Sequence, residues 1–404
     1  YFGGSVAQAL SAVNTTIARV NQVYERDLAV KLELVSNNDL LLYTNATTDP
    51  FTDITNNRQM LTENQTSVDS VIGSANYDIG HVITSDVGGG IAFLGVVCDS
   101  TYKAQGMTGH FAPVNDPFDI DYVAHEIGHQ FRGNHSFNAT LDGCNREATA
   151  AWEIGNGVTI MGYAGICNTS NDVSSNSIAM FHTGNLREMS TFIDTGGEWG
   201  AGGPNCGTAS SLRNQQPVVN AGADYTIPVS TPFTLTGSAT DADTTDSLTY
   251  SWEQMNIGTI ANISDGDLGD NPLFRVFLPS AVNSRTFPQI SDILNNTVTT
   301  GEVLPTTSRN LNFTLTVRDQ RGGVAEDSAI IKVVQTTTPF KITSHTTAST
   351  LSAGSNVTLT WDVGGTTAAP ISCSNVDISL SIDDGNTFAS SLALSSPNDG
   401  SEAV

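Results

Sequence analysis

Apolar residues recur three and four positions apart in several stretches of the N-terminal half. The spacing of Leu10, Val13, Ile17 and Val20 predicts an amphipathic helix over Val6–Leu28, with Ser5 in the N-cap position. Weaker versions of the same spacing predict three more helices. They are Asn57–Val71, residues 120–131 and residues 179–193.

Alternating apolar and polar positions predict three strands among these helices. They are residues 30–35, 77–84 and 90–97. A glycine-rich turn at Gly88 and Gly89 separates the last two strands. Residues 136–177 are rich in Gly, Asn and Thr and have no periodic pattern, so we expect them to be irregular. Together these elements predict an α/β domain over residues 1–210.

The pattern changes at about Gln215, where helical periodicity gives way to short Val-, Thr- and Leu-rich strands separated by polar turns. That spacing predicts an Ig-like β-sandwich over residues 215–335. A linker follows at residues 336–339, and a similar pattern then predicts a second, incomplete Ig-like sandwich over residues 340–404. Trp252 and Trp361 each end an alternating strand and are the expected core anchors.

Composition and charge narrow the class of protein. The 404 residues are 39% apolar, and no apolar stretch approaches the ~20 residues of a membrane helix, so we expect no membrane insertion. Lys and Arg number 16 against 41 Asp and Glu, a formal charge of −25 that is spread along the whole chain. Such an acidic surface argues against binding to nucleic acid or to anionic membranes. It suits a secreted, extracellular protein.

The cysteines and the N-terminus also suit secretion. Four of the five cysteines lie within residues 1–210 without a C-x-x-C pair, which favours two disulfides in an oxidising compartment over a cysteine metal site. Three pairings are open, and free buried thiols are the alternative. Tyr1 is not followed by a leader sequence, so we expect a processed or truncated piece of a longer precursor from which any signal peptide is gone.

The residues that carry chemistry lie in the predicted helix over residues 120–131. His125 and His129 are four positions apart, so they share one helix face and can bind a single Zn²⁺. Glu126, beside the first histidine, projects toward a water at the metal and can act as a general base. The alternative is a surface helix with two solvated histidines.

His135 follows six residues after His129. On a straight helix it would lie about 9 Å further along, so it can join the site only if the helix stops after Phe131 and the chain turns sharply. Gly133 and Asn134 tolerate the positive φ of such a turn. The three histidines then form three corners of a tetrahedron and leave the fourth to water.

This long motif resembles the signature of the metzincin metalloproteases, H-E-x-x-H-x-x-G-x-x-H followed by a methionine turn. Arg132 stands where the family has glycine. Either Arg132 takes the left-handed conformation at a cost of roughly 1 kcal/mol, or the turn forms one residue later. The resemblance makes Met161 the methionine beneath the zinc. Tyr163 would be the nearby tyrosine that binds zinc at rest or stabilises the oxyanion.

Within the metzincins the chain is similar to the adamalysin/reprolysin branch, especially its bacterial secreted members with Ig-like domains. This resemblance implies a twisted mixed sheet, a long active-site helix, and an edge strand over residues 90–98 to which substrate adds as a further strand. It implies disulfides Cys98–Cys206 and Cys144–Cys167. It also implies a calcium ion at Asp78, for which a capping or turn role is the alternative.

A second acidic group lies in the first predicted sandwich. Asp241, Asp243 and Asp246 form an alternating carboxylate cluster before a strand, as in the calcium-binding loops of extracellular modules. An acidic turn without a metal is the alternative. The expected cofactors are therefore Zn²⁺ and Ca²⁺.

These patterns together predict a secreted zinc endopeptidase that hydrolyses peptide bonds of extracellular proteins, with Glu126 as general base. In a second hypothesis the Ig-like domains define the function by attaching the protein to a cell-surface or matrix polymer. In a third the metzincin domain is degenerate and non-catalytic because Arg132 disturbs the turn.

Overall fold

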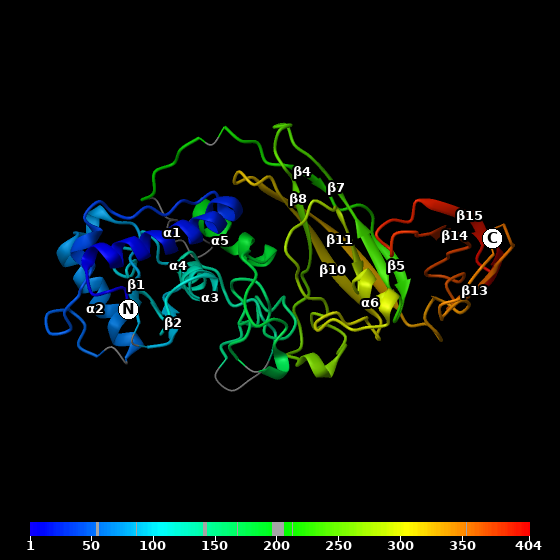
Figure 1. Ribbon diagram of the computed structural model, residues 1–404, viewed down its shortest axis with the longest axis horizontal. Helices are drawn as coiled ribbons and strands as arrows, with labels where there is room; N and C mark the ends of the chain where they lie inside the picture. The colour runs from blue at the N-terminus through cyan, green and yellow to red at the C-terminus, as the bar shows by residue number, and fades with distance from the viewer. Residues whose placement is uncertain are drawn as a thin grey trace.

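The computed structural model describes residues 1–404 except 54–55, 86, 140–143, 168, 196–205, 212 and 353. Helices and a small sheet form the N-terminal region, an irregular stretch follows, and two β-rich regions complete the chain (Figure 1). The N-terminus lies in the helical region and the C-terminus at the opposite end of the long axis (Figure 1).

The first two predicted helices are confirmed with their bounds. Helix α1 is Val6–Leu28, and the Ser5 side chain accepts a hydrogen bond from the Gln8 amide as its N-cap. Its inner face buries Val20, Val23 and Tyr24, and the Tyr24 hydroxyl donates to the Ala124 carbonyl at 2.8 Å. Helix α2 is Asn57–Val71.

The N-terminal sheet has three strands in the order β1 (Val82–Thr84), β3 (Gly106–Gly109) and β2 (Gly89–Ala92). Strand β1 is parallel to β3, and β2 is antiparallel to it. The two strands predicted from the sequence are shorter than expected, and they do not pair with each other. The central strand β3 is not predicted by the sequence pattern. All four of its residues are buried, so it has no alternation of apolar and polar positions that would indicate a strand.

The strand predicted over residues 30–35 is wrong, because these residues belong to no strand of any sheet. The side-chain amide of Asn21 on α1 accepts from the Leu32 amide and donates to the Leu32 carbonyl, both at 2.8 Å. One side chain therefore supplies the hydrogen bonds that a neighbouring strand would have made.

The predicted helix over residues 120–131 is confirmed, and it begins earlier. It runs from α3 (Asp116–Phe118) through the π-helical turn η3 (Asp119–Ala124) to α4 (His125–Gln130). Helix α5 is Thr183–Thr195, somewhat later than predicted. Short 3-10 turns are η1 (Asn38–Leu41), η2 (Ser74–Asn76) and η4 (Thr169–Asn171). Within the described part of residues 136–177, η4 is the one helical element, as expected of an irregular segment.

The first β-rich region contains a four-stranded sheet in the order β5–β11–β10–β8 and two strand pairs, β4–β7 and β6–β9. The Trp252 side chain is buried in its core with Phe313 and Leu315. The strands are β4 (Val218–Asn220), β5 (Tyr225–Pro228), β6 (Phe233–Thr236), β7 (Ser238–Thr240), β8 (Thr249–Gln254), β9 (Ser284–Phe287), β10 (Arg309–Arg318) and β11 (Val324–Val334). Two short helices, η5 (Ile263–Asp265) and α6 (Ile290–Asn295), lie between them.

The second β-rich region pairs β12 (Lys341–Ile342), β13 (Thr358–Asp362) and β16 (Ser401–Ala403), and separately β14 (Asn375–Leu380) with β15 (Ser390–Pro397). Trp361 is buried, and its indole nitrogen donates to Asn398 Oδ1 at 2.9 Å. The architecture is thus a mixed α/β region followed by β-rich sheets. Among the described residues, no helix is long and apolar enough to cross a membrane.

The α/β region and the first β-rich region pack against each other through buried apolar side chains. Ile154, Val158 and Met180 of the former form one apolar cluster with Val276 and Val303 of the latter. At another point the buried Arg318 side chain on β10 contacts Asp27 of α1 at 2.9 Å. The two regions are therefore joined by buried contacts as well as by the chain itself.

Candidate metal centre

Three histidine rings converge where α4 ends. The Nε2 atom of His129 lies 3.1 Å from Nε2 of His125 and 3.0 Å from Nε2 of His135. His125 and His129 extend from successive turns of α4, and His135 comes from the segment that follows the helix. The sequence-predicted trio is therefore brought together as one candidate metal site.

The other ring nitrogen of each histidine faces a backbone carbonyl. His125 Nδ1 donates to the Ile160 carbonyl at 2.6 Å, and His129 Nδ1 donates to that of Gly133 at 2.7 Å. His135 Nδ1 donates to the Asn145 carbonyl. Because a carbonyl can only accept, these contacts fix the proton on Nδ1 and leave the Nε2 lone pairs pointing at one another.

The Nε2 atom of His129 lies about 3 Å from each of the other two, and such converging lone pairs repel one another unless a cation lies between them. Imidazole nitrogens about 2.0–2.1 Å from a tetrahedral Zn²⁺ suit that spacing. Burial also lowers the pKa of all three imidazoles, that of His129 to about 3. The rings are therefore neutral and able to ligate. The residues present fit zinc.

The turn that brings His135 into the site forms at Arg132, whose φ is 75°. Of the two possibilities left by the sequence, the left-handed arginine is the one observed, and the expectation of positive φ at Gly133 and Asn134 is wrong. The Arg132 amide bonds the His129 carbonyl, and the Gly133 amide bonds that of Gly128, both at 2.8 Å. These bonds close the helix, so Arg132 does not prevent the turn.

Glu126 is buried beside the histidines. Its Oε2 atom has no hydrogen-bond partner, and burial raises the pKa of this carboxyl to about 8. The backbone of Gly90 on the edge strand β2 covers it, since a Cβ added there would lie 2.5 Å from Glu126 Cγ and Cδ. A buried carboxyl with an unused oxygen next to a metal site has the surroundings of a proton-transfer group.

Met161 packs under α4, and the Tyr163 ring packs beside those of His125 and His135. Met161 is fully buried, and its sulfur lies under Gly128 of α4, where an added Cβ would be 2.6 Å from it. The Tyr163 ring centroid is 4.6 Å from that of His135 and 5.6 Å from that of His125. Burial, with a smaller contribution from Glu126, raises the pKa of the Tyr163 hydroxyl. The phenol is therefore protonated and can donate.

Sequence reasoning missed two carboxylates that support the site. Glu153 is buried and accepts hydrogen bonds from Ser136 Oγ at 2.6 Å and from the Val158 and Thr159 amides. It thereby joins the residue after His135 to the segment before Met161. Glu188 on α5 holds Asn134 through two hydrogen bonds. Neither residue stands in a motif, so no local signal marked them.

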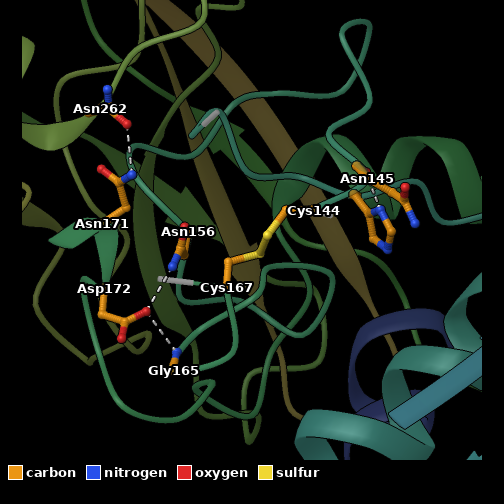
Figure 2. Close-up of a disulfide and its surroundings, with 9 residues drawn as sticks. Cys144, Asn145, Asn156, Gly165, Cys167, Asn171, Asp172 and Asn262 are labelled. Atoms are coloured by element: carbon orange, nitrogen blue, oxygen red, sulfur yellow. Dashed lines mark hydrogen bonds between the residues drawn. A yellow bond between two sulfur atoms is a disulfide. The ribbon is translucent and has the colours of Figure 1, made fainter. Parts of the chain in front are cut away.

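The structure contains both disulfides that the resemblance implied, Cys98–Cys206 and Cys144–Cys167, and Cys373 is a free thiol. The second disulfide joins two parts of the irregular segment close to Asn145 (Figure 2). On the same segment Asp172 accepts from Asn156 at 2.7 Å and from the Gly165 amide at 3.2 Å (Figure 2).

The two predicted calcium sites differ in what surrounds them. Carboxylate oxygens of Asp241, Asp243 and Asp246 lie within 4.8 Å of one another. Asp241 Oδ2 is buried without a partner, while Asp246 pairs with Arg321 at 3.0 Å. Asp78 is exposed, and its carbonyl accepts from the Cys98 amide at 2.9 Å. Among the described residues, no group of three metal-ligating side chains includes Asp78.

Residues 1–191 match the family model of the reprolysin-like metallo-peptidases of family M12B. No curated protein matches the sequence. Among solved structures, the chain is similar to a nucleoside hydrolase-related hypothetical protein from Saccharophagus degradans associated with carbohydrate metabolism, at 18% identity and a TM-score of 0.18 over 30% of this chain and 26% of that one. It is also similar to human mucin-like protocadherin EC1-2, at 19% identity and a TM-score of 0.16 over 31% of this chain and 55% of that one. TM-scores this low establish nothing about the fold.

Proposed function

We propose that this chain, in which residues 1–191 form a reprolysin-like metallopeptidase domain of family M12B, is a secreted zinc endopeptidase acting on extracellular proteins. The observation that carries the proposal is the convergence of three unprotonated Nε2 atoms beside the buried, unpartnered carboxyl oxygen of Glu126. Together they provide a metal site with a proton acceptor next to it.

His125, His129 and His135 would hold the zinc ion, which supplies Lewis-acid polarisation of a carbonyl and lowers the pKa of water. Glu126 takes a proton from the attacking water and passes it to the leaving amine. The Tyr163 hydroxyl donates a hydrogen bond to the oxyanion that develops. Strand β2 lies at the edge of its sheet and offers its backbone to an extended peptide, which recognises substrate with little demand on side chains.

Replacing Glu126 by Ala tests the proposal. Because the carboxyl is not a ligand, we expect one zinc per chain and an unchanged circular dichroism spectrum, while casein cleavage falls by about three orders of magnitude or more. Glu33→Ala, which removes an exposed carboxylate far along the chain, is the matched control and should retain full activity. Undiminished cleavage by Glu126→Ala would overturn the proposal.

Secretion is supported by the two disulfides in the α/β region, since such bonds persist in oxidising compartments. We propose domains over residues 1–210, 215–335 and 340–404, with Ig-like sandwiches as the second and third. Their support is the separate buried core around Trp252 and the buried Trp361. Attachment of these domains to a cell-surface or matrix polymer stays a prediction, which a pull-down of the full chain on such polymers tests.

We propose calcium at Asp241, Asp243 and Asp246, supported by the closeness of their oxygens and the buried unpartnered Oδ2 of Asp241. Calcium at about 100 times its dissociation constant should stabilise the folded state by about 2.7 kcal/mol. Urea unfolding with and without calcium, at fixed zinc, measures the effect. The doubly substituted Asp241→Asn/Asp243→Asn chain should lose it, and a response unchanged in that variant contradicts this site. Calcium at Asp78 stays a prediction.

A further inference from the structure

The third histidine of the metal site is held by a chain of contacts that leads out of the α/β region. His135 Nδ1 donates to the Asn145 carbonyl, and the next residue is Arg146. Arg146 donates through Nε and Nη2 to Asn138 Oδ1, at 3.0 and 2.8 Å. Its Nη2 also donates to the carbonyl of Gly258 at 2.9 Å. Gly258 belongs to the loop that follows β8 in the first β-rich region.

Asn138 contacts the same loop. Its side-chain nitrogen donates to the Thr259 carbonyl at 3.0 Å, while its backbone amide bonds the Glu153 carbonyl at 2.8 Å. Arg146 and Asn138 therefore lie against two successive carbonyls of residues 258–259. Asp270 holds this loop, because its two oxygens accept from the Thr259 amide at 3.0 Å and the Thr259 hydroxyl at 3.1 Å. Gly258 packs directly on Asp270, where an added Cβ would lie 2.6 Å from the carboxyl carbon.

His135 depends on such support more than the other two histidines do. His125 and His129 stand on helix α4, whose regular backbone fixes the points from which their rings extend. His135 stands after the helix, and its partner Asn145 lies in an irregular segment. The residue before Asn145 is anchored by the Cys144–Cys167 disulfide (Figure 2). The residue after it, Arg146, is anchored by its hydrogen bonds to Asn138 and Gly258.

The β-rich region contacts this irregular segment at a second place. Asn171 donates to Asn262 Oδ1 at 2.8 Å (Figure 2). The Ile263 amide donates to Asn171 Oδ1 at 3.0 Å. Residues 258–259 and 262–263 therefore contact the irregular segment at Asn138, Arg146 and Asn171. The contact at Arg146 is one of two places where this loop meets the segment.

We propose that Arg146 is a positioning residue of the metal site. The first β-rich region then supports metal binding indirectly, because its Gly258 carbonyl accepts a hydrogen bond from Arg146. The proposal rests on the proposed zinc function. Contacts behind a ligating histidine fix its ring orientation, and their loss typically weakens metal binding about 10- to 100-fold. Arginine suits the position because its planar guanidinium donates to Asn138 and Gly258 at once, whereas a lysine ammonium on a flexible stem lacks that fork.

The test measures the zinc dissociation constant of the full chain by competition with a chromophoric chelator at one pH. Arg146→Ala should weaken zinc binding about 10- to 100-fold, and Arg146→Lys should recover little of it. Arg275→Ala is the matched control. Arg275 also crosses between the two regions, to the Val173 carbonyl at 2.9 Å, but it bonds neither Asn138 nor Asn145. We expect its zinc affinity to equal that of the wild type.

Gly258→Ala tests the contact from the other side while Arg146 stays in place. Because the added methyl group would collide with Asp270, the loop must shift, and we expect zinc affinity to fall here too. Thermal unfolding of the metal-free chains shows whether each variant folds. If Arg146→Ala does not fold, Arg146→Lys and Gly258→Ala decide in its place.

The outcomes separate the two proposals. Wild-type chain that binds no zinc would overturn the proposed function itself. Wild-type chain that binds zinc tightly while the folded Arg146 and Gly258 variants bind it equally well would overturn this inference and leave the proposed function intact. A loss of affinity as large in Arg275→Ala would also overturn it, because the effect would then reflect any loosening between the two regions.

Discussion

The absence of a side chain at Gly90 leaves space for the carboxyl group of Glu126, the proposed general base. Any other side chain there would begin with a Cβ 2.5 Å from Glu126 Cγ and Cδ, which is closer than atoms can approach. The carboxyl of Glu126 fits under β2 because this position has no side chain. Nothing in the sequence pattern marks Gly90 among its glycine neighbours.

Gly90→Ala should therefore displace the Glu126 carboxyl. A misplacement of about 1 Å can cost about 100-fold in rate, so we expect kcat/KM on a peptide substrate to fall at least about 10-fold, with zinc content unchanged. Gly88→Ala is the control, since its added methyl would meet only the exposed Phe111 ring, at 3.3 Å. Equal activity of the two variants would show that Gly90 does not position the base.

At the scale of elements, His81 joins the N-terminal sheet to the active-site helix. Its Nδ1 bonds Gln130 Oε1 on α4 at 2.9 Å, and its Nε2 bonds Thr108 Oγ1 on β3 at 2.8 Å. Burial lowers the pKa of His81 from 6.5 to about 4, although the bond to Gln130 opposes the shift. Packing of α4 against β3 therefore favours the neutral ring.

Because the folded-state pKa of His81 is depressed, the unfolded chain binds more protons between pH 6.5 and about 4. The stability from neutral His81 is fully present above pH 6.5 and is lost as the pH falls through this window, by up to about 3 kcal/mol. Urea unfolding of metal-free chains measures it. His81→Gln, which does not titrate, should lose less stability on acidification, and an equal loss in both chains would contradict this role.

At the scale of the whole molecule, a buried ion pair joins the α/β region to the first β-rich region. The side chains of Asp27 and Arg318 are fully buried. Arg318 also bonds Ser251 Oγ at 3.1 Å and the Phe181 carbonyl at 3.2 Å. Burial alone would raise the pKa of Asp27, but Arg318 and Arg26 outweigh it and lower that pKa. Asp27 thus stays charged and needs its partners.

Arg318→Met should cost about 3–5 kcal/mol in the free energy of unfolding, because it leaves the Asp27 charge buried without Arg318. The exposed pair Arg187–Glu326 also joins the two regions, and Arg187→Ala should cost less than about 1 kcal/mol. Urea unfolding compares the two. The Asp27→Asn/Arg318→Met chain should lose less than the sum of its single variants, and strict additivity would show that the pair is not coupled.

Local patterns predicted some elements well and others poorly. The bounds of α1 and α2 followed from periodicity, because a helix with one apolar face has apolar residues three and four positions apart along the sequence. Strand β3 and the false strand at residues 30–35 did not follow. Their structure depends on partners in other elements of the fold. For β3 these partners are the flanking strands, and for Leu32 the partner is the Asn21 side chain on α1.

The sequence alone determined the two principal helices and the placing of His125, Glu126 and His129, since residues one and four apart on a helix have a fixed geometry. Only the tertiary structure decided that Arg132 makes the turn, that Glu126 is buried under Gly90, and which carbonyls hold the imidazoles. It also brought the Gly258 carbonyl to Arg146, more than a hundred residues away. Such contacts depend on how separate elements pack, and no spacing between neighbouring residues encodes them.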